Sequence, residues 1–186
     1  HATNAVANMS LGGGFSSALN NAIANSVAAG VTYAVAAGNE TTDACSRSPA
    51  STPSAITVAS TTSTDAKSSF SNWGTCVDIN APGSSITSAY ITSNTATATM
   101  SGTSMASPHV AGAAAVYLSA NPGSNPSAVT SALKALATPG VVTGLPAGTP
   151  NLLLYTRLES VNPDPDPDPD PTLVASFTKM CSGFTC

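Results

Sequence analysis

A twelve-residue string over residues 101–112, SGTSMASPHVAG, constrains this chain more than any other feature. It places Ser104 between a glycine-containing turn and the start of a helix rich in small residues, where backbone N–H groups of the first helical turn would surround its hydroxyl. That arrangement can present a serine as a nucleophile. The triplet Gly102-Thr103-Ser104 alone is more typical of an ordinary helix cap before a buried alanine helix. The complete string is much rarer and favours the nucleophile.

The spacing of apolar residues predicts an α/β fold. Apolar runs over 5–11 and 31–37 predict two buried strands, with a helix between them that Ser16 or Ser17 caps and Gly30 ends. A strand, a helix and a strand in this order predict a right-handed βαβ unit with a parallel pair. The remaining predicted elements are strands over 55–59, 77–81 and 151–155, a hairpin over 85–91 and 95–100, and helices over about 104–120 and 125–138.

Composition excludes some functions. Only 8% of the residues are charged, and the net charge of -4 comes from the Pro-Asp repeat near the C-terminus. The sequence predicts neither a basic face for nucleic acid nor an apolar run of the roughly 20 residues that span a membrane. Four cysteines fit an oxidising compartment. The repeat over 162–171 predicts an extended spacer, and a metal site at its aspartates is the alternative.

The strings Gly102-Thr103-Ser104-Met105-Ala106 and Pro108-His109-Val110-Ala111-Gly112 resemble the nucleophile motif of subtilisin-like serine proteases, with details similar to the proteinase K branch. The resemblance runs over about 6–155 and matches the later part of such a catalytic domain. It implies a mainly parallel sheet flanked by helices in three layers, with the upstream strands missing. We therefore expect an internal piece of a longer protein: catalytic domain 1–160, linker 161–172, and 173–186 as the start of a β-sandwich similar to polycystic-kidney-disease-type domains.

The resemblance assigns Ser104 as the nucleophile, which needs a histidine base that an aspartate orients. The family's segments around that aspartate and that histidine are absent, and the chain has two histidines. His1 has no motif around it. His109 lies five residues after Ser104, roughly 140° around a helix, so we expect it to face away as a hydrogen-bonded packing residue. We therefore expect these 186 residues to be inactive by themselves.

Asn39 ends the string Ala36-Ala37-Gly38-Asn39, directly after a predicted strand. The resemblance makes it the oxyanion-hole donor, together with the N–H of Ser104; the alternative is an ordinary turn asparagine. The resemblance also assigns substrate-binding residues on two facing segments whose small side chains imply a roomy apolar pocket for aromatic or aliphatic groups. These residues are Ser10, Leu11, Gly12 and Gly13 on one segment, and Ala36, Ala37 and Gly38 on the other.

Two structural features are also implied by the resemblance. Cys45 and Cys76 match a disulfide of proteinase K relatives, with free buried cysteines as the alternative, and Cys181 and Cys186 could close a small hairpin. The segment with Pro49 and Ser51, together with Asp78, resembles a calcium site, although Asp78 could equally cap a loop. No cofactor is expected for catalysis, and the sequence holds no Cys/His pattern for zinc.

These features together predict a secreted, extracellular bacterial serine endopeptidase that acts as a monomer on protein or peptide substrates. A non-catalytic subtilase-like binding or scaffold protein is the competing interpretation, because the base and its partner are unseen. An esterase of the α/β-hydrolase type is disfavoured, since no Gly-x-Ser-x-Gly elbow surrounds Ser104.

Overall fold

The computed structural model describes residues 4–156. The elements in chain order are β1 (Ala5–Met9), β2 (Gly13–Gly14), α1 (Ser17–Ala28), β3 (Val31–Ala36), the 3-10 turn η1 (Ala44–Ser46), β4 (Arg47–Ser48), β5 (Ile56–Thr61), β6 (Ile79–Pro82), β7 (Ile86–Ala89), β8 (Thr97–Met100), α2 (Thr103–Ala120), α3 (Pro126–Leu136), β9 (Thr138–Pro139) and β10 (Leu152–Leu153). The expected linker over 161–172 and accessory module over 173–186, with Cys181 and Cys186, lie outside the described residues.

Six strands form the main sheet in the order β1-β3-β5-β6-β10-β9. The first five run parallel, and β9 is antiparallel to β10. A parallel pair needs a long crossover, and α1 lies in the connection between β1 and β3, whose register pairs Val6 with Thr32. The predicted α/β class with a mainly parallel sheet is therefore confirmed.

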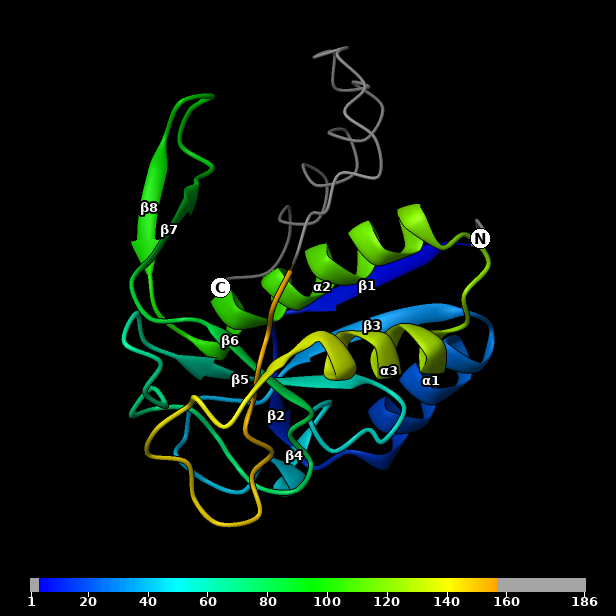
Figure 1. Cartoon of the computed structure of the whole chain (residues 1–186), viewed down its shortest axis with the longest axis horizontal. Helices are drawn as coiled ribbons and strands as arrows, with labels where there is room; N and C mark the ends of the chain where they lie inside the picture. Colours follow the sequence, from blue (N-terminus) through cyan, green and yellow to red (C-terminus); the bar gives the residue numbers. More distant parts are fainter. Residues whose placement is uncertain (1–3, 157–186) are drawn as a thin grey trace. The chain divides into compact units, whose positions relative to one another are not determined.

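Helices cover both faces of this sheet (Figure 1). Ala34 of β3 belongs to a buried cluster with Val110 of α2 and Leu133 of α3, whereas the next residue, Val35, packs with Ile23 of α1. Because successive side chains of a strand point to opposite faces, α2 and α3 lie on one face and α1 lies on the other. The fold thus has the three layers that the resemblance to subtilisin-like proteases implies.

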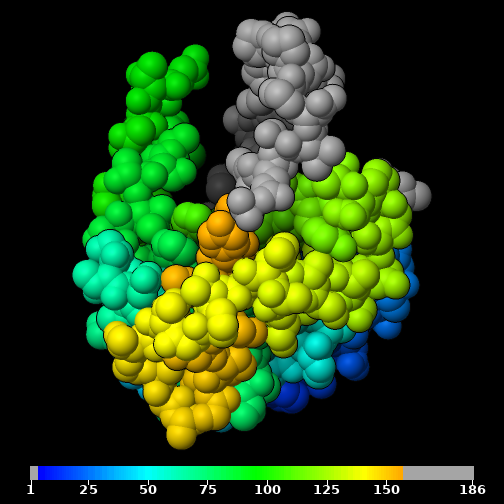
Figure 2. Space-filling model, viewed as in Figure 1, coloured from blue at the N-terminus to red at the C-terminus, as the bar shows by residue number. Residues whose placement is uncertain are grey.

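The expected hairpin is β7 and β8, which pair antiparallel with Ile86 opposite Met100. Figure 1 shows it standing out from the sheet, and its green atoms project in the same way in Figure 2. Both strands are shorter than predicted, because turns occupy residues 91–95. The N–H of Tyr90 still donates across the hairpin to the carbonyl of Ala96 at 2.8 Å. Tyr90 and Ile91 are exposed near the tip.

Side-chain caps explain where two of the helices begin. The Ser16 hydroxyl accepts a hydrogen bond from the N–H of Leu19, and the Asn125 amide oxygen accepts one from the N–H of Ala128. Helix α2 differs, because its cap residue is Gly102 and no side chain caps it. Its first N–H groups therefore remain for acceptors from elsewhere in the molecule.

Three two-residue strands were not predicted. Strands β2 and β4 pair with each other, Gly13 opposite Ser48 and Gly14 opposite Arg47, and β9 joins the edge of the main sheet. Segments this short carry no readable alternation of apolar and polar residues. Long-range pairing alone makes them strands.

Cys45 and Cys76 form a disulfide that closes a loop over a sequence separation of 31. We expect the double variant Cys45→Ser/Cys76→Ser to lose roughly 3 to 4 kcal/mol of unfolding free energy, because the open loop raises the entropy of the unfolded chain. Chemical denaturation followed by circular dichroism measures the loss. The wild-type protein in reductant should match the double variant; a variant as stable as the oxidised wild type would contradict the expectation.

Candidate active site

Ser104 lies in the first turn of α2, where its N–H group has no acceptor within the helix. The side chain is partly exposed, and its hydroxyl donates to the carbonyl of Ser10 at 3.3 Å. Ser10 directly follows β1, so the segment after this strand lies against the start of α2. The sequence-predicted nucleophile and the first substrate-binding residue are therefore neighbours.

A proline inside α2 strengthens this junction. Pro108 has no N–H group, so it cannot make the helical hydrogen bond to the carbonyl of Ser104 four residues earlier. The hydroxyl of Ser10 donates to that carbonyl instead, at 2.7 Å. Asn8 of β1 donates to the same Ser10 hydroxyl and accepts from the hydroxyl of Ser107, at 2.9 and 2.7 Å. The side chains of Asn8, Ser10 and Ser107 and the missing N–H of Pro108 thus connect β1 to the start of α2.

Asn39 is held on the other side of Ser104. Its amide oxygen accepts from the N–H of Thr103 at 2.8 Å and from the hydroxyl of Thr103 at 3.0 Å. The same hydroxyl accepts from the N–H of Gly38 at 3.1 Å. With two donors on the oxygen, the amide nitrogen of Asn39 points the other way; a Cβ placed on Gly102 would lie 3.7 Å from it.

The site can therefore offer two N–H donors beside one hydroxyl. The amide nitrogen of Asn39 lies near Gly102, and the N–H of Ser104 has no acceptor within α2. A negative oxygen that forms when the Ser104 hydroxyl adds to a carbonyl group is stabilised by such donors. This is the chemistry of acyl transfer.

The two substrate-binding segments are only partly free. Leu11, Gly12 and Gly13 are exposed, but Gly13 is already paired with Ser48 in the β2–β4 ladder. Ala36 and Ala37 are buried, and Ala37 packs into a cluster that includes Val77. The parts of the two segments that stay accessible are therefore Ser10 to Gly12 on one side and Gly38, which is half-buried, on the other.

A groove of about 380 Å³ lies beside the nucleophile. His109 is exposed and lines this groove together with Ser104, so the expectation that it faces away as a packing residue is wrong. The groove extends along α2 next to β7, which allows residues well apart on the helix to share it. The expected hydrogen bond is present, because Nδ1 of His109 lies 2.8 Å from the carbonyl of Met105.

Thr57 connects the two parts of the expected calcium site by hydrogen bonds. Its hydroxyl donates to the carbonyl of Ala50, between Pro49 and Ser51, and its N–H donates to Oδ2 of Asp78. These carbonyl and carboxylate oxygens are the ligand types that calcium prefers. The other oxygen of Asp78, Oδ1, accepts from Nζ of Lys134 at 3.0 Å. A cation at this carboxylate must therefore compete with an ammonium group.

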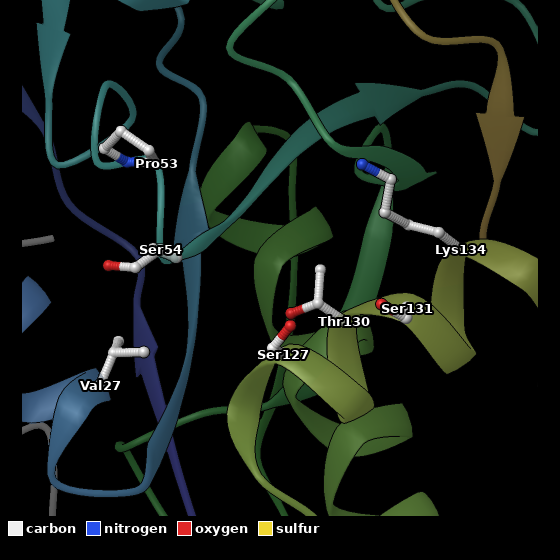
Figure 3. A pocket seen from close by; sticks show the side chains of 8 residues that line it. Val27, Pro53, Ser54, Ser127, Thr130, Ser131 and Lys134 are labelled. Atoms are coloured by element: carbon white, nitrogen blue, oxygen red, sulfur yellow. The ribbon is translucent and has the colours of Figure 1, made fainter.

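Lys134 also lines the larger groove, of about 570 Å³, between α3 and the loop that carries Pro53 and Ser54 (Figure 3). Hydroxyl groups of Ser127 and Ser131 face this groove from α3. None of its lining residues belongs to the Ser104 site. Within residues 4–156, no group of three or more His, Cys, Asp or Glu side chains could hold a metal ion.

A hydroxyl at an uncapped helix start, beside the end of a parallel strand and an asparagine amide, is the arrangement expected of a serine nucleophile in an α/β fold. The Subtilase family matches residues 1–153. The chain therefore belongs to the subtilase family. Among the helices that the structure describes, none is long and apolar enough to cross a membrane.

Named relatives agree with this membership. The chain is 60% identical over 156 residues to the "Extracellular serine proteinase" of Thermus sp. (strain Rt41A), covering 84% of this chain and 38% of the relative. It is 54% identical to "Alkaline serine exoprotease A" of Vibrio alginolyticus, covering 81% and 28%. A solved "cold adapted subtilisin-like serine proteinase" superposes with a TM-score of 0.81 at 51% identity, covering 84% of this chain and 56% of that one. The chain thus spans less than half the length of these curated relatives.

Sequence reasoning did not assign roles to Thr103, Asn8 or Pro108. Thr103 and Pro108 stand inside the 101–112 string, so their position was visible but their partners were not. Asn8 gave a clearer signal, because it is a polar residue within the apolar strand AVANM. Asn8 is half-buried there, and a polar side chain among apolar neighbours is expected to have hydrogen-bond partners.

Stability measurements can test whether the Ser10 hydroxyl replaces the helical hydrogen bond that Pro108 cannot make. Ser10→Ala should cost about 1 kcal/mol, because the carbonyl of Ser104 loses its donor. In a Pro108→Ala background the same change should cost much less, since residue 108 then supplies the helical N–H. Chemical denaturation of the four proteins gives the coupling; equal costs in both backgrounds would contradict this account.

Proposed function

We propose that the protein is a secreted serine endopeptidase that cleaves peptide bonds through an acyl-enzyme on Ser104. The observation that supports the proposal is the double hydrogen bond from Thr103 to the oxygen of Asn39, which fixes the side chain so that its amide nitrogen is the group that could donate to a substrate oxygen. Membership of the subtilase family and the names of the relatives support it. The disulfide and the "Extracellular" relative support secretion.

In the proposed reaction, the Ser104 oxygen attacks the peptide carbonyl carbon while a histidine base takes its proton. The carbonyl oxygen becomes negative and accepts hydrogen bonds from Nδ2 of Asn39 and the N–H of Ser104. The base then gives the proton to the leaving amine, the carbon–nitrogen bond breaks, and an ester to Ser104 remains. Water, activated by the same base, hydrolyses the ester and frees the serine.

The substrate is proposed to be an extended protein or peptide chain. The exposed segment from Ser10 to Gly12 leaves backbone groups free to pair with it, in the manner of strand addition. No cofactor is needed for this chemistry. Small residues on the facing segments, with no charged anchor, favour broad acceptance of aromatic or aliphatic side chains.

The base is proposed to lie outside residues 1–186. The ring nitrogen Nδ1 of His109 is engaged with the carbonyl of Met105, and the Ser104 hydroxyl contacts Ser10. His1, the other histidine of the sequence, lies outside the described residues. We accordingly propose that residues 1–186 alone do not turn over a peptide, whereas the full-length protein does.

Variants of the full-length protein test the function. Ser104→Ala should abolish turnover of a chromogenic peptide, and Asn39→Ala should lower kcat by roughly 100-fold to 1000-fold, because one oxyanion donor is lost. Ser131→Ala, at an exposed serine of α3, is the matched control and should keep wild-type rates. A wild-type protein that neither cleaves peptides nor reacts at Ser104 with a fluorophosphonate would instead favour the scaffold alternative.

A structural calcium ion is also proposed, bound by the carbonyls of Pro49 and Ser51 and by Asp78. The ion would supply no catalytic chemistry; it would neutralise the carboxylate and hold the loop before β5. Because Lys134 occupies Oδ1 of Asp78, ion and ammonium compete. The competition makes calcium affinity depend on a residue that is not a ligand.

Removal of Lys134 should therefore strengthen calcium binding. In Lys134→Met, the calcium concentration that gives half of the full rise in Tm is expected to be about fivefold lower than in the wild type. This factor corresponds to about 1 kcal/mol, as for a partly exposed ion pair. Thermal unfolding across a calcium titration measures it, with Lys67→Met as a control, since that ammonium donates to Ser68. The same Tm in calcium and in chelator for both variants and the wild type would overturn the calcium proposal.

A further inference from the structure

We propose that Asn72 is a positioning residue for the reaction: it fixes the loop over 37–42 that presents Asn39 to the oxyanion. The inference rests on the proposed function, because it assigns Asn72 an effect through Asn39. Asn72 lies in the chain between β5 and β6, and its side chain is completely buried. It does not face the groove beside Ser104.

Every hydrogen-bonding site of the Asn72 amide is used on the Asn39 loop. The nitrogen Nδ2 donates to the carbonyl of Ala37 at 2.9 Å and to Oε2 of Glu40 at 2.7 Å. The oxygen Oδ1 accepts from the N–H groups of Glu40 and Thr42, both at 3.0 Å. An amide has two donors and two acceptor sites, so its capacity is filled.

The backbone of Asn72 adds a fifth bond, from its N–H to the carbonyl of Gly38 at 3.0 Å. Residues on both sides of Asn39 are thereby tied to one side chain and its own backbone. Asn39 is bonded to Thr103 instead. The two sets of contacts have different effects. Asn72 fixes where the backbone of Asn39 lies, and Thr103 fixes the direction in which the Asn39 side-chain amide points.

Asn72 is itself anchored to the sheet. The N–H of Ser60 in β5 donates to the hydroxyl of Ser71 at 2.9 Å, and that hydroxyl donates to the carbonyl of Asn72 at 3.0 Å. Ser60 and Ser71 are both buried. A short chain of buried hydrogen bonds therefore links the loop that carries the oxyanion donor to strand β5, which is part of the main sheet.

The fit around Gly38 shows how little freedom the loop has. Gly38 has a φ of +102°, a conformation that favours glycine, and a Cβ built there would overlap Nδ2 of Asn72. The amide of Asn72 thus occupies the space that any other residue at position 38 would need. A carboxylate at position 72 would keep the two acceptor bonds but would face the carbonyl of Ala37 and the carboxylate of Glu40 without donors.

This arrangement makes a specific kinetic prediction. An oxyanion donor must lie about 2.7–3.1 Å from the oxygen that becomes negative, and a misplacement of about 1 Å can cost roughly 100-fold. We expect Asn72→Asp in the full-length protein to lower kcat by roughly 10-fold to 100-fold with little change in KM, because Asn39 acts mainly in the transition state.

Asn80 provides a matched control. It is an equally buried asparagine in β6, and its Nδ2 donates to the carbonyls of Pro150 and Leu152, away from Asn39. Asn80→Asp and Asn72→Asp should both lower Tm, yet Asn80→Asp should leave kcat near the wild-type value. A drop in kcat for both variants in proportion to their loss of Tm would mean a structural role only and would overturn the inference.

A double-mutant cycle separates the inference from the proposed function. In the Asn39→Ala background, Asn72→Asp should cause less than a twofold further loss of kcat, since the donor it positions is already gone. If Ser104→Ala keeps turnover, the proposed function fails. If Ser104→Ala is inactive but the losses of Asn39→Ala and Asn72→Asp multiply, the function stands and the positioning role fails.

Glu40→Ala covers the case in which Asn72→Asp does not fold. Glu40 is an exposed residue, so its removal leaves the core intact while it takes one acceptor from Nδ2 of Asn72. We expect kcat to fall about threefold, a loss of order one modest hydrogen bond, and to show no further effect in the Asn39→Ala background. An unchanged kcat for Glu40→Ala would overturn the inference.

Discussion

The structure around the nucleophile depends on the hydrogen bonds between Thr103 and Asn39. They join the first residue of α2 to the loop after β3, at 2.8 and 3.0 Å, and they use the N–H that an uncapped helix start leaves free. A capping side chain at position 102 would accept instead from the N–H of Ser104 or Met105. The absence of a cap is therefore part of the site, since it leaves the N–H of Ser104 without a side-chain acceptor while Asn39, from another strand end, accepts from Thr103.

The parallel sheet makes this junction possible. Strands β1 and β3 are neighbours that run in the same direction, so Ser10 and Asn39, which follow them, emerge at the same edge. Helix α2 packs across the sheet with its first residues at that edge, between the two segments. Open parallel sheets bind ligands at the carboxyl ends of their strands for this geometric reason. Two further residues fix the geometry of this junction. Pro108 leaves the carbonyl of Ser104 free for Ser10, and Asn72 holds the loop of Asn39.

Sequence alone predicted the features that local chemistry determines. Apolar periodicity gave the long strands and helices, and Ser16 and Asn125 cap helices as their residue types suggest. Features made by partners far apart in the chain were not predictable in this way. The Thr103–Asn39 bonds join residues 64 apart, and the Ser10–Ser104 bonds join residues 94 apart. The prediction that His109 is a packing residue was wrong, because the angle between two residues on a helix does not tell which side of that helix other elements cover.

The central claim is that Asn39 and the N–H of Ser104 form one oxyanion site. A crystal structure of the full-length protein with a peptide boronic acid tests it most directly, because the boronate mimics the tetrahedral intermediate. The account predicts a bond from boron to Oγ of Ser104 and one boronate oxygen within about 2.7–3.1 Å of both Nδ2 of Asn39 and the N–H nitrogen of Ser104. A boronate bound to another residue, or an oxygen that turns away from Asn39, would contradict the account.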